Sequence, residues 1–497
     1  MCSSKPVSRL LSAEMRLPMI RTALCLGLLG GLTACAVGPD YQPPSFSLPA
    51  LFRTSAPPPP SPAATAIPAT PALAEWWRGF GDPVLDRLVT DALTGSLDLA
   101  AAEARLSQAR ARAGGAQANR LPTLDGTGSA QRRSLSLAGP EGAGAGRPGF
   151  ERETSLYQGG FETGWELDLF GGLARGRDAA VAELAASEAD RAAVRVALVA
   201  DVARTYIAVR GLQQRLAVQQ RTLDTQAETR SLAVARVSAG LSPDLDVAQA
   251  DALLAATRAT LPPLETELVA QTNRLAVLLG KAPGEVDALV ARPAPVPVSP
   301  SLANGVIPAD LLRQRPDLRR AERQLAAANA RIGVAMAEYF PRVSLSGSFG
   351  VQAGATDRLS NSDARFWSIG PALRWRLFDF GRIDAEVAER RGAEAEALAR
   401  YRLAVLTALE EVETSLATVA GRRARLDALD QAVAAGRRSL DLAEEQYRRG
   451  IATFLAVLEA RRALDQSEAD RAAARQEAAD AAIAAFRALG GGWEREG

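Results

Sequence analysis

One long segment of this chain is present twice, and any fold assigned to the chain has to accommodate both copies. A shift of 210 positions aligns residues 165–280 with residues 375–490 without a gap, so that Trp165 falls on Trp375. Self-similarity at a fixed distance is the mark of a structural unit that is used more than once. Each copy begins with a short strand-like run and continues into two long helical patterns.

The repeat extends toward the N-terminus with a slightly different shift of 219 positions, under which Pro122 falls on Pro341. Each half therefore reads as helix, strand, strand and two long helices. The change of shift places the extra length of the first half between its two strands, where residues 139–149 have the glycine-rich composition of a loop. This loop contains a GxGxxG match, but Pro148 interrupts it and a strand follows, so no nucleotide site is indicated.

The strand-like runs alternate between apolar and polar residues. After Pro341, apolar residues or glycine occupy the odd positions of 343–351, and serine or glycine occupies the even positions. Period-two alternation predicts strands with one apolar and one polar face. Each run has about ten residues, the length of a tilted strand that crosses a bilayer, and aromatic residues near the ends suit the membrane interfaces. The interface aromatics expected on this basis are Trp165, Trp367 and Trp375.

The number of strands limits how such a sheet is completed. A sheet with one wet face in a soluble protein is the alternative explanation, but the sequence offers no further strand-like runs for a second layer. Lipid does not satisfy the open edge of a sheet, and known single-chain barrels begin at about eight strands. Four strands from one chain therefore predict a membrane barrel that two or three chains share.

Two uninterrupted helical patterns cover residues 172–239 and 381–449, neither of which contains proline. At about 1.5 Å per residue, each helix would be near 100 Å long. Apolar residues in them recur in steps of three and four, which is typical of coiled coils. Returning helices are expected at 244–279 and 453–489, with a kink or break of the first at Pro262-Pro263. Shorter helices are expected before the strands, at 96–119 and 315–338.

The N-terminus is typical of a secretion signal. Basic residues precede a short apolar stretch at 22–32, too short to span a bilayer. The stretch ends in Leu-Thr-Ala-Cys, which resembles the lipobox of bacterial lipoproteins and implies that Cys35 is acylated and becomes the mature N-terminus. An ordinary signal peptide with a chance cysteine is the alternative. Ala36 after the cysteine implies sorting to the outer membrane, and residues 36–74 have the proline-rich composition of an extended tether.

The composition argues against an enzyme. The chain has no histidine, and its three cysteines lie within the first 35 residues. This removes most hydrolytic triads and most zinc or iron sites, so no catalytic residue, metal or cofactor is expected. A net charge of +1 also gives no indication of a nucleic-acid partner.

Several motifs in a fixed order resemble one family. They are Cys35–Tyr41, Trp76–Asp86, Arg315–Leu318, Phe340-Pro341 and the junction Phe378–Arg382. Together they resemble outer-membrane efflux lipoproteins of the TolC superfamily, in its NodT/OprM-like branch. The resemblance implies a mixed α and β fold: a membrane β-barrel shared between chains, continuing into a long periplasmic α-helical barrel. It also implies a homotrimer with twelve strands that contacts outer-membrane lipid, a periplasmic adaptor protein and an inner-membrane pump, usually of the resistance-nodulation-division type.

By the same resemblance, the turns at 238–248 and 448–458 form the periplasmic mouth of the channel. Glu459 matches an acidic residue just inside the second turn, whereas Ala456 stands where some relatives have a second Asp. Carboxylates repeated around an axis repel one another and favour cations. The gate candidates are Glu459, Asp244 and Asp246, and the candidates for adaptor contact at the tips are Gly240, Arg448, Arg449 and Gly450.

The sequence thus predicts a passive outer-membrane duct, lipid-anchored, that exports small toxic compounds. Two alternatives stay open: the exit duct of a type I protein-secretion system, and a lipid-anchored coiled-coil scaffold, which leaves the alternating strands unexplained. The expected segments are a signal peptide (1–34), a lipidated tether (35–74), two repeats (75–280 and 307–490), a linker (281–306) and a tail (491–497).

Overall fold

The structure is a computed structural model that describes residues 36–46, 71–140, 146–148, 150–300 and 314–493. The predicted signal peptide and Cys35 lie outside the described residues. The chain divides into two compact units, each built from three separate stretches. Unit 1 comprises Met1–Pro43, Ala109–Leu184 and Gln324–Leu398, and unit 2 comprises Pro44–Gln108, Ala185–Arg323 and Ala399–Gly497.

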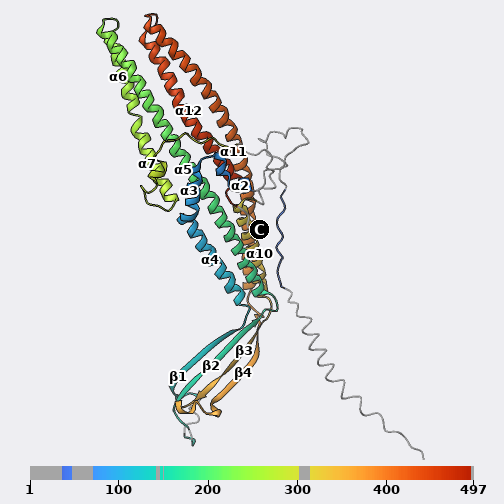
Figure 1. Cartoon of the computed structure of the whole chain (residues 1–497). Coiled ribbons are helices and arrows are strands. Elements are labelled where there is room, and N and C mark those ends of the chain that lie inside the picture. Colours follow the sequence, from blue (N-terminus) through green and yellow to red (C-terminus); the bar gives the residue numbers. More distant parts are fainter. Residues whose placement is uncertain (1–35, 47–70, 141–145, 149, 301–313, 494–497) are drawn as a thin grey trace, which may run out of the picture. The chain divides into compact units, whose positions relative to one another are not determined.

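Unit 1 contains one antiparallel sheet of four strands in the order β1-β2-β3-β4 (Figure 1). The strands are β1 (Thr123–Ser134), β2 (Glu153–Leu167), β3 (Arg342–Ala353) and β4 (Arg365–Arg374), with two short 3-10 turns, η3 (Thr356–Arg358) and η4 (Ser362–Ala364), between the last two. The order follows the chain, so β1 and β4 are the outer strands.

The strand register confirms the predicted alternation. Phe161 of β2 lies opposite Phe349 of β3, which lies opposite Trp367 of β4. On the other face Glu162 lies opposite Ser348. The apolar–polar alternation of the sequence continues to Leu377, but β4 ends at Arg374, where β3 no longer offers a partner.

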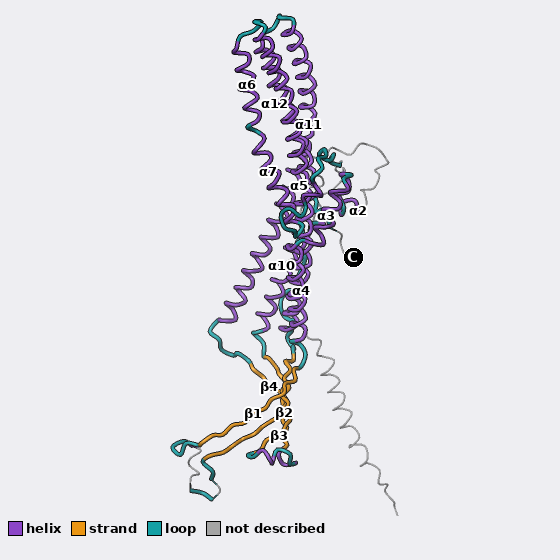
Figure 2. Tube along the Cα trace, turned by 60° about the vertical axis from the view of Figure 1, so that its left-hand side comes forward, coloured by secondary structure: helices purple, strands orange, loops and turns teal. Residues whose placement is uncertain are grey.

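The helices follow the predicted pattern closely. The helices directly before the strands of the two halves are α4 (Leu97–Ala118) and α10 (Pro316–Ala337), and the long helices are α5 (Gly172–Ser238) and α11 (Arg382–Arg448). The returning helix of the second half is continuous, α12 (Phe454–Ala488). That of the first half is broken into α6 (Asp244–Arg258) and α7 (Leu261–Leu278), as the two prolines predicted (Figure 2).

Each long helix begins at a tight turn that an aspartate caps. The Asp168 carboxylate accepts hydrogen bonds from the backbone N–H groups of Leu173 (3.0 Å) and Ala174 (2.7 Å). Asp379 accepts from Gly381 (3.0 Å) and Ile383 (2.8 Å). Carboxylates satisfy the free N–H groups of a helix N-terminus, so both long helices are capped in the same way.

The largest core of unit 2 surrounds the tryptophan pair near the start of the described chain. Trp76 and Trp77 are buried, and Trp76 stacks on Phe486 with ring centroids 5.2 Å apart. Asp82 caps α3 (Pro83–Gly95) by accepting a hydrogen bond from the N–H of Val84 at 2.8 Å. The short elements α2 (Pro71–Ala74), η1 (Trp76–Phe80) and α8 (Asp287–Val290) complete this part of the unit. The tryptophans are packing anchors.

No described helix combines the length and the apolar character that a membrane-spanning helix requires.

Candidate functional site

The two helical turns that the sequence singled out have the same backbone geometry. Gly240 has φ of 70° and Gly450 has φ of 74°, the left-handed conformation that glycine adopts most readily. The N–H of Leu241 donates to the carbonyl of Arg236 at 2.8 Å, and that of Ile451 donates to Gln446 at 2.9 Å. Both long helices therefore end in a Schellman motif before the chain reverses. We call residues 238–248 and 448–458 the first and second tip turns.

The two helix pairs pack against each other beneath the tip turns. Tyr447, near the end of α11, is buried and lies 5.4 Å from Phe454 between ring centroids. The guanidinium of Arg236 from α5 lies 4.4 Å above the Tyr447 ring, and the Tyr447 hydroxyl donates to Asp246 of α6 at 3.4 Å. Tyr447 thus contacts both pairs of helices. Sequence reasoning missed this residue, because an isolated tyrosine in a long helix carries no pattern.

The candidate gate residues differ in their surroundings. Asp246 contacts Tyr447, whereas Asp244 and Glu459 are exposed and make no ion pair with any other described residue. The structure therefore brings one of the three carboxylates into a side-chain hydrogen bond and leaves the other two without an ion pair among the described residues. Their carboxylates are available to solvent or to another chain.

The tip arginines pair with acids of their own helix. Arg448 lies 3.8 Å from Glu444 and 3.9 Å from Glu445, and Arg449 pairs with Glu445. Glu444 also contacts Arg461 of α12 at 2.9 Å. The i,i+4 spacing of these acids and arginines is a signal that sequence reasoning could have used. Exposed pairs of this kind contribute at most about 1 kcal/mol, so both arginines stay accessible to a partner.

The sheet presents two chemically different faces. The polar face carries Glu162, Glu166 and Ser348, and the Ser348 and Ser368 hydroxyls lie 2.9 Å apart. The other face exposes large apolar side chains, among them Phe349, Trp367, Ile369 and Leu373. A continuous exposed apolar face of this kind marks a surface that another apolar phase covers.

The three predicted interface tryptophans lie at the ends of the strands or just beyond. Trp165 lies in β2 and Trp375 follows β4, and each donates a 3.0 Å hydrogen bond to a backbone carbonyl, of Arg120 and Tyr339 respectively. Trp367, in β4, is 73% exposed. An exposed ring with a polar N–H is suited to the boundary between lipid and water.

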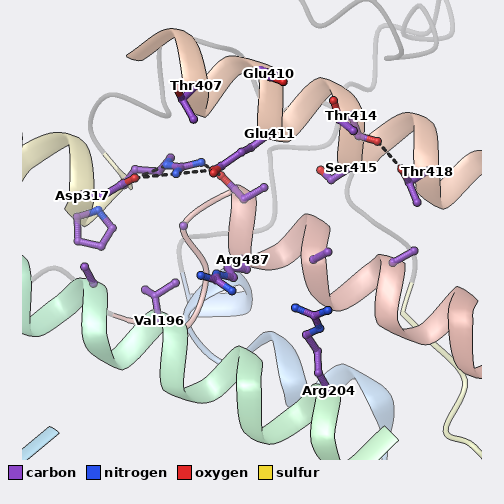
Figure 3. Close-up of a pocket in the computed structure, with 17 residues that line it drawn as sticks. Val196, Arg204, Asp317, Thr407, Glu410, Glu411, Thr414, Ser415, Thr418 and Arg487 are labelled. Atoms are coloured by element: carbon purple, nitrogen blue, oxygen red, sulfur yellow. Dashed lines mark hydrogen bonds and ion pairs between the residues drawn. The ribbon is translucent and has the colours of Figure 1, made fainter. Parts of the chain in front are cut away.

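A cavity of about 730 Å³ in unit 2 is lined by residues of α5, α11 and α12 and by the start of α10 (Figure 3). At its edge the buried Arg315 pairs with Asp317 and Glu411, both at 2.7 Å, and donates to the carbonyl of Ala488 at 2.9 Å. Burial by itself raises the pKa of Asp317, but the Arg315 guanidinium outweighs this and holds the pKa below its usual value. Arg315 thus ties the end of α12 to the start of α10, which explains the Arg-Pro-Asp-Leu motif structurally.

A short N-terminal segment is held tightly within unit 1. Arg175, 8% exposed, donates to the carbonyls of Val37 (3.1 Å) and Gly38 (3.2 Å) and to the Asp40 carboxylate (2.8 Å). A Cβ atom on Gly38 would lie 2.5 Å from the Cα of Gly333, so only glycine fits there. We call residues 36–40 the strap. Sequence reasoning described this segment as part of an extended tether and missed Arg175.

The described residues contain no group of three or more histidine, cysteine, aspartate and glutamate side chains arranged to hold a metal.

Comparison with known proteins gives one consistent result. The profile of the family described as "Outer membrane efflux protein" matches residues 88–281 and 307–491. Nodulation protein T of Rhizobium leguminosarum bv. trifolii is 32% identical over 462 residues, which are 93% of this chain and 95% of that protein. The pyoverdine export outer membrane protein OpmQ of Pseudomonas putida is 35% identical over 437 residues, covering 88% and 92%.

Solved structures agree with the sequence relatives. The outer-membrane channel OprN superimposes with a TM-score of 0.84 at 36% identity, covering 92% of this chain and 100% of that chain. The outer membrane protein VceC of Vibrio cholerae superimposes with a TM-score of 0.77 at 29% identity, covering 85% and 99%. The predicted TolC-like fold is confirmed, and the chain belongs to the outer membrane efflux protein family, whose members are export channels and not enzymes.

Proposed function

We propose that three copies of this chain form the outer-membrane exit duct of a tripartite efflux system. The observation that carries the proposal is the four-stranded sheet with one polar face, one apolar face and two unpaired outer strands. A membrane sheet must close on itself, because lipid cannot satisfy free backbone groups. Three copies supply enough strands for a barrel whose polar face lines a water-filled passage.

The duct supplies no energy and exports small toxic compounds delivered by an inner-membrane pump of the resistance-nodulation-division type through a periplasmic adaptor. Relatives named as export proteins for pyoverdine and as part of a toluene efflux pump support this substrate class. The exposed tip turns, with Arg448 and Arg449 beside Gly450, are the proposed contact for the adaptor. The two halves of the duct correspond to the proposed repeats 75–280 and 307–490.

Cys35 is the proposed lipid attachment site, and the strap supports an anchored N-terminus. Residues 36–40 follow Cys35 directly, and Arg175 holds them at the junction between β2 and α5. An acyl group on the preceding residue would be held close to the strands that enter the membrane. Labelled palmitate should be incorporated into the natural chain and not into Cys35→Ser, and labelling of the variant would refute the assignment.

The gate is proposed to form at the tip turns from Glu459, Asp244 and Asp246. Two of these carboxylates are exposed, so symmetry-related copies can bring them together around an axis. Mutual repulsion then makes the closed state sensitive to cations and ionic strength. Trp165, Trp367 and Trp375 are the proposed interface aromatics of the barrel.

The decisive experiment removes the gene and measures growth against a panel of solvents, dyes and antibiotics. Small-molecule export predicts increased sensitivity to several compounds, restored by the natural chain. The type I secretion alternative predicts unchanged sensitivity and loss of a secreted protein from the medium. Unchanged sensitivity together with unchanged secretion would reject both forms of the duct and favour a scaffold.

A further inference from the structure

The polar face of the sheet carries charges of opposite sign on its two β-hairpins. In the first hairpin Asp125 of β1 lies directly opposite Glu162 of β2, and Glu166 lies further along β2. In the second hairpin Arg342 of β3 lies directly opposite Arg374 of β4. The two hairpins belong to the two copies of one repeat, so the change of sign distinguishes structures that are otherwise equivalent.

All five charged side chains lie on the same face of the sheet. Residues directly opposite each other in neighbouring strands share a face, and the register of β2 and β3 pairs Glu162 with Ser348 and Glu166 with Ser344. Ser344 and Arg342 are two positions apart in β3, so their side chains also point to one face. The acidic and the basic hairpin therefore present one continuous surface to water.

The sign of the charge reverses between equivalent positions of the repeat. The shift of 210 that relates the two halves places Glu166 on Arg376, which follows the end of β4. The same shift places the uncharged Gly164 on Arg374. The two copies thus differ at the positions that set the charge of this face, although their strand pairing is the same.

The carboxylates of the first hairpin remain unpaired within the described part of the chain. None of Asp125, Glu162 and Glu166 forms an ion pair with a described residue. Asp125 and Glu162 are exposed, and like charges directly opposite each other destabilise a strand pair. An uncharged hydroxyl is enough to keep such a face wet, as at Ser348 on the next strand. The opposed carboxylates therefore cost stability that contact with water alone does not require.

The second hairpin keeps a net positive charge on the same face. Arg374 forms no ion pair with a described residue. Arg342 and Arg376 both pair with Glu338, Arg376 at 3.4 Å, so this one carboxylate offsets only one of their two charges. A positive region therefore lies beside the negative region of the first hairpin.

The two regions are close enough to act on one small solute. Glu166 and Arg342 are diagonal neighbours on adjacent strands, a relationship that separates Cβ atoms by about 7–8 Å. Glu166 of β2 and Arg374 of β4 are separated by one intervening strand, which adds about 10 Å across the sheet. Charges in water are screened over about 8 Å at physiological ionic strength. A solute at this surface therefore interacts with both signs of charge.

We infer that this surface makes the duct favour solutes that carry both a positive and a negative group. The inference rests on the proposed function, in which the polar face lines the water-filled passage, and it adds a substrate class. We call Asp125, Glu162, Glu166, Arg342 and Arg374 the bipolar wall. A positive group of the solute interacts with the carboxylates while a negative group interacts with the arginines. A solute of one sign is attracted by one hairpin and repelled by the other.

Single-channel recording in planar bilayers tests the bipolar wall in the full-length protein with two matched probes. Ampicillin carries an ammonium and a carboxylate, whereas benzylpenicillin has the same ring system and the carboxylate alone. Each probe is added on the side of the strands, so that it reaches the wall without passing the tip turns. At about 0.1 M salt we expect ampicillin to interrupt the current for at least about threefold longer per event than benzylpenicillin.

Two variants remove one charge of each sign from the exposed or half-exposed face. Glu166→Gln should shorten the interruptions by ampicillin to those of benzylpenicillin, because the ammonium loses its partner. Arg374→Gln should shorten the interruptions by both probes, because both carry the carboxylate. In a salt gradient the two variants should shift the reversal potential in opposite directions, Glu166→Gln toward anions and Arg374→Gln toward cations.

Arg133→Gln is the matched control for a change of charge on the same face. Arg133 is exposed, and like Asp125 it occupies an odd position of β1, about 26 Å further along the strand. The variant should leave the interruptions by ampicillin unchanged, because its charge lies several screening lengths from the bipolar wall. Shortening as strong as that by Glu166→Gln would overturn the inference, since any charge on the face would then have the same effect.

The recordings also separate this inference from the proposed function. Channels that conduct current but are interrupted equally long by the two probes would overturn the bipolar wall and leave the duct in place. A chain that inserts into the bilayer without conducting current would overturn the duct and the wall with it. Longer interruptions by ampicillin that Glu166→Gln and Arg374→Gln both shorten support the two together.

Discussion

The indole N–H of Trp375 donates a 3.0 Å hydrogen bond to the backbone carbonyl of Tyr339, at the junction between strands and helices. Trp165 makes the same contact with Arg120 at the same distance. Each tryptophan is related to its counterpart by 210 positions and each acceptor by 219. The donor and the acceptor lie in elements that different shifts relate, yet both halves contain the same hydrogen bond. The repeat is therefore one structural unit that the chain uses twice.

Replacing Trp375 with phenylalanine removes this hydrogen bond while keeping an aromatic ring. We expect the variant to lose about 1 kcal/mol of stability, the usual net value of one hydrogen bond, and Trp165→Phe to lose a similar amount. Urea unfolding of the protein in detergent measures this. Trp367→Phe is the matched control, since its indole donates no hydrogen bond to a described residue. An equal loss in the control would assign the effect to the ring and not to the hydrogen bond.

The fold was predictable from sequence because periodicity carries it. Helix bounds agreed to within one or two residues, and the break before Pro262 was anticipated, since proline removes a backbone donor whatever surrounds it. The end of β4 was not predictable, because a strand ends where its partner ends, and β3 begins at Arg342, which leaves no residue of β3 opposite Trp375. The contacts of Tyr447 and Arg175 were missed for a related reason. Each depends on residues from distant parts of the chain.

Because of Asp480 in α12, we expect the free energy of unfolding to decrease as the pH rises from about 4 to about 6. Burial raises its pKa to about 6 from an ordinary 3.8, against the opposing attraction of Arg204 and a hydrogen bond from Gln476. Between these values the folded state keeps a proton that the unfolded state has released, so the free energy of unfolding decreases from about pH 4 to about pH 6. Above about pH 6 the free energy of unfolding stays at this lower value, because the buried carboxylate is then charged in the folded state as well.

We expect Asp480→Asn to be more stable than the natural chain at pH 8, by at most about 3 kcal/mol, and to match it near pH 4. Thermal unfolding across this pH range in one ionic strength measures the difference. Asp470→Asn on the same helix is the control, and it should leave the pH dependence unchanged. A pH-independent difference for Asp480→Asn would assign its effect to packing.

Arg175 should decide whether the strap stays docked. Arg175→Met keeps the length of the side chain but removes all three donors to Val37, Gly38 and Asp40. We expect proteases to cleave residues 36–46 at least about tenfold faster in the variant, because its docked state loses three charge-assisted hydrogen bonds, one of them also an ion pair. Arg177→Met is the control, since Arg177 pairs only with the adjacent Asp178 among the described residues. Equal cleavage in both variants would show that the glycine contacts alone hold the strap.

Tyr447 and Glu459 should affect the resting conductance by different routes. Tyr447→Phe removes the hydroxyl that donates to Asp246 and keeps the ring beneath Arg236, so it weakens one contact between the helix pairs. Glu459→Gln removes one exposed charge and no contact with a described residue. We expect Tyr447→Phe to raise the resting conductance in planar bilayers at every salt concentration.

Glu459→Gln should alter the conductance at low salt, with the difference shrinking at about 1 M salt, where charges are screened within about 3 Å. Asp441→Asn is the matched control and should change neither, because Asp441 is exposed near the C-terminal end of α11 and is in no ion pair among the described residues. If Glu459→Gln also leaves the low-salt conductance unchanged, Glu459 is an ordinary solvated carboxylate on a helix.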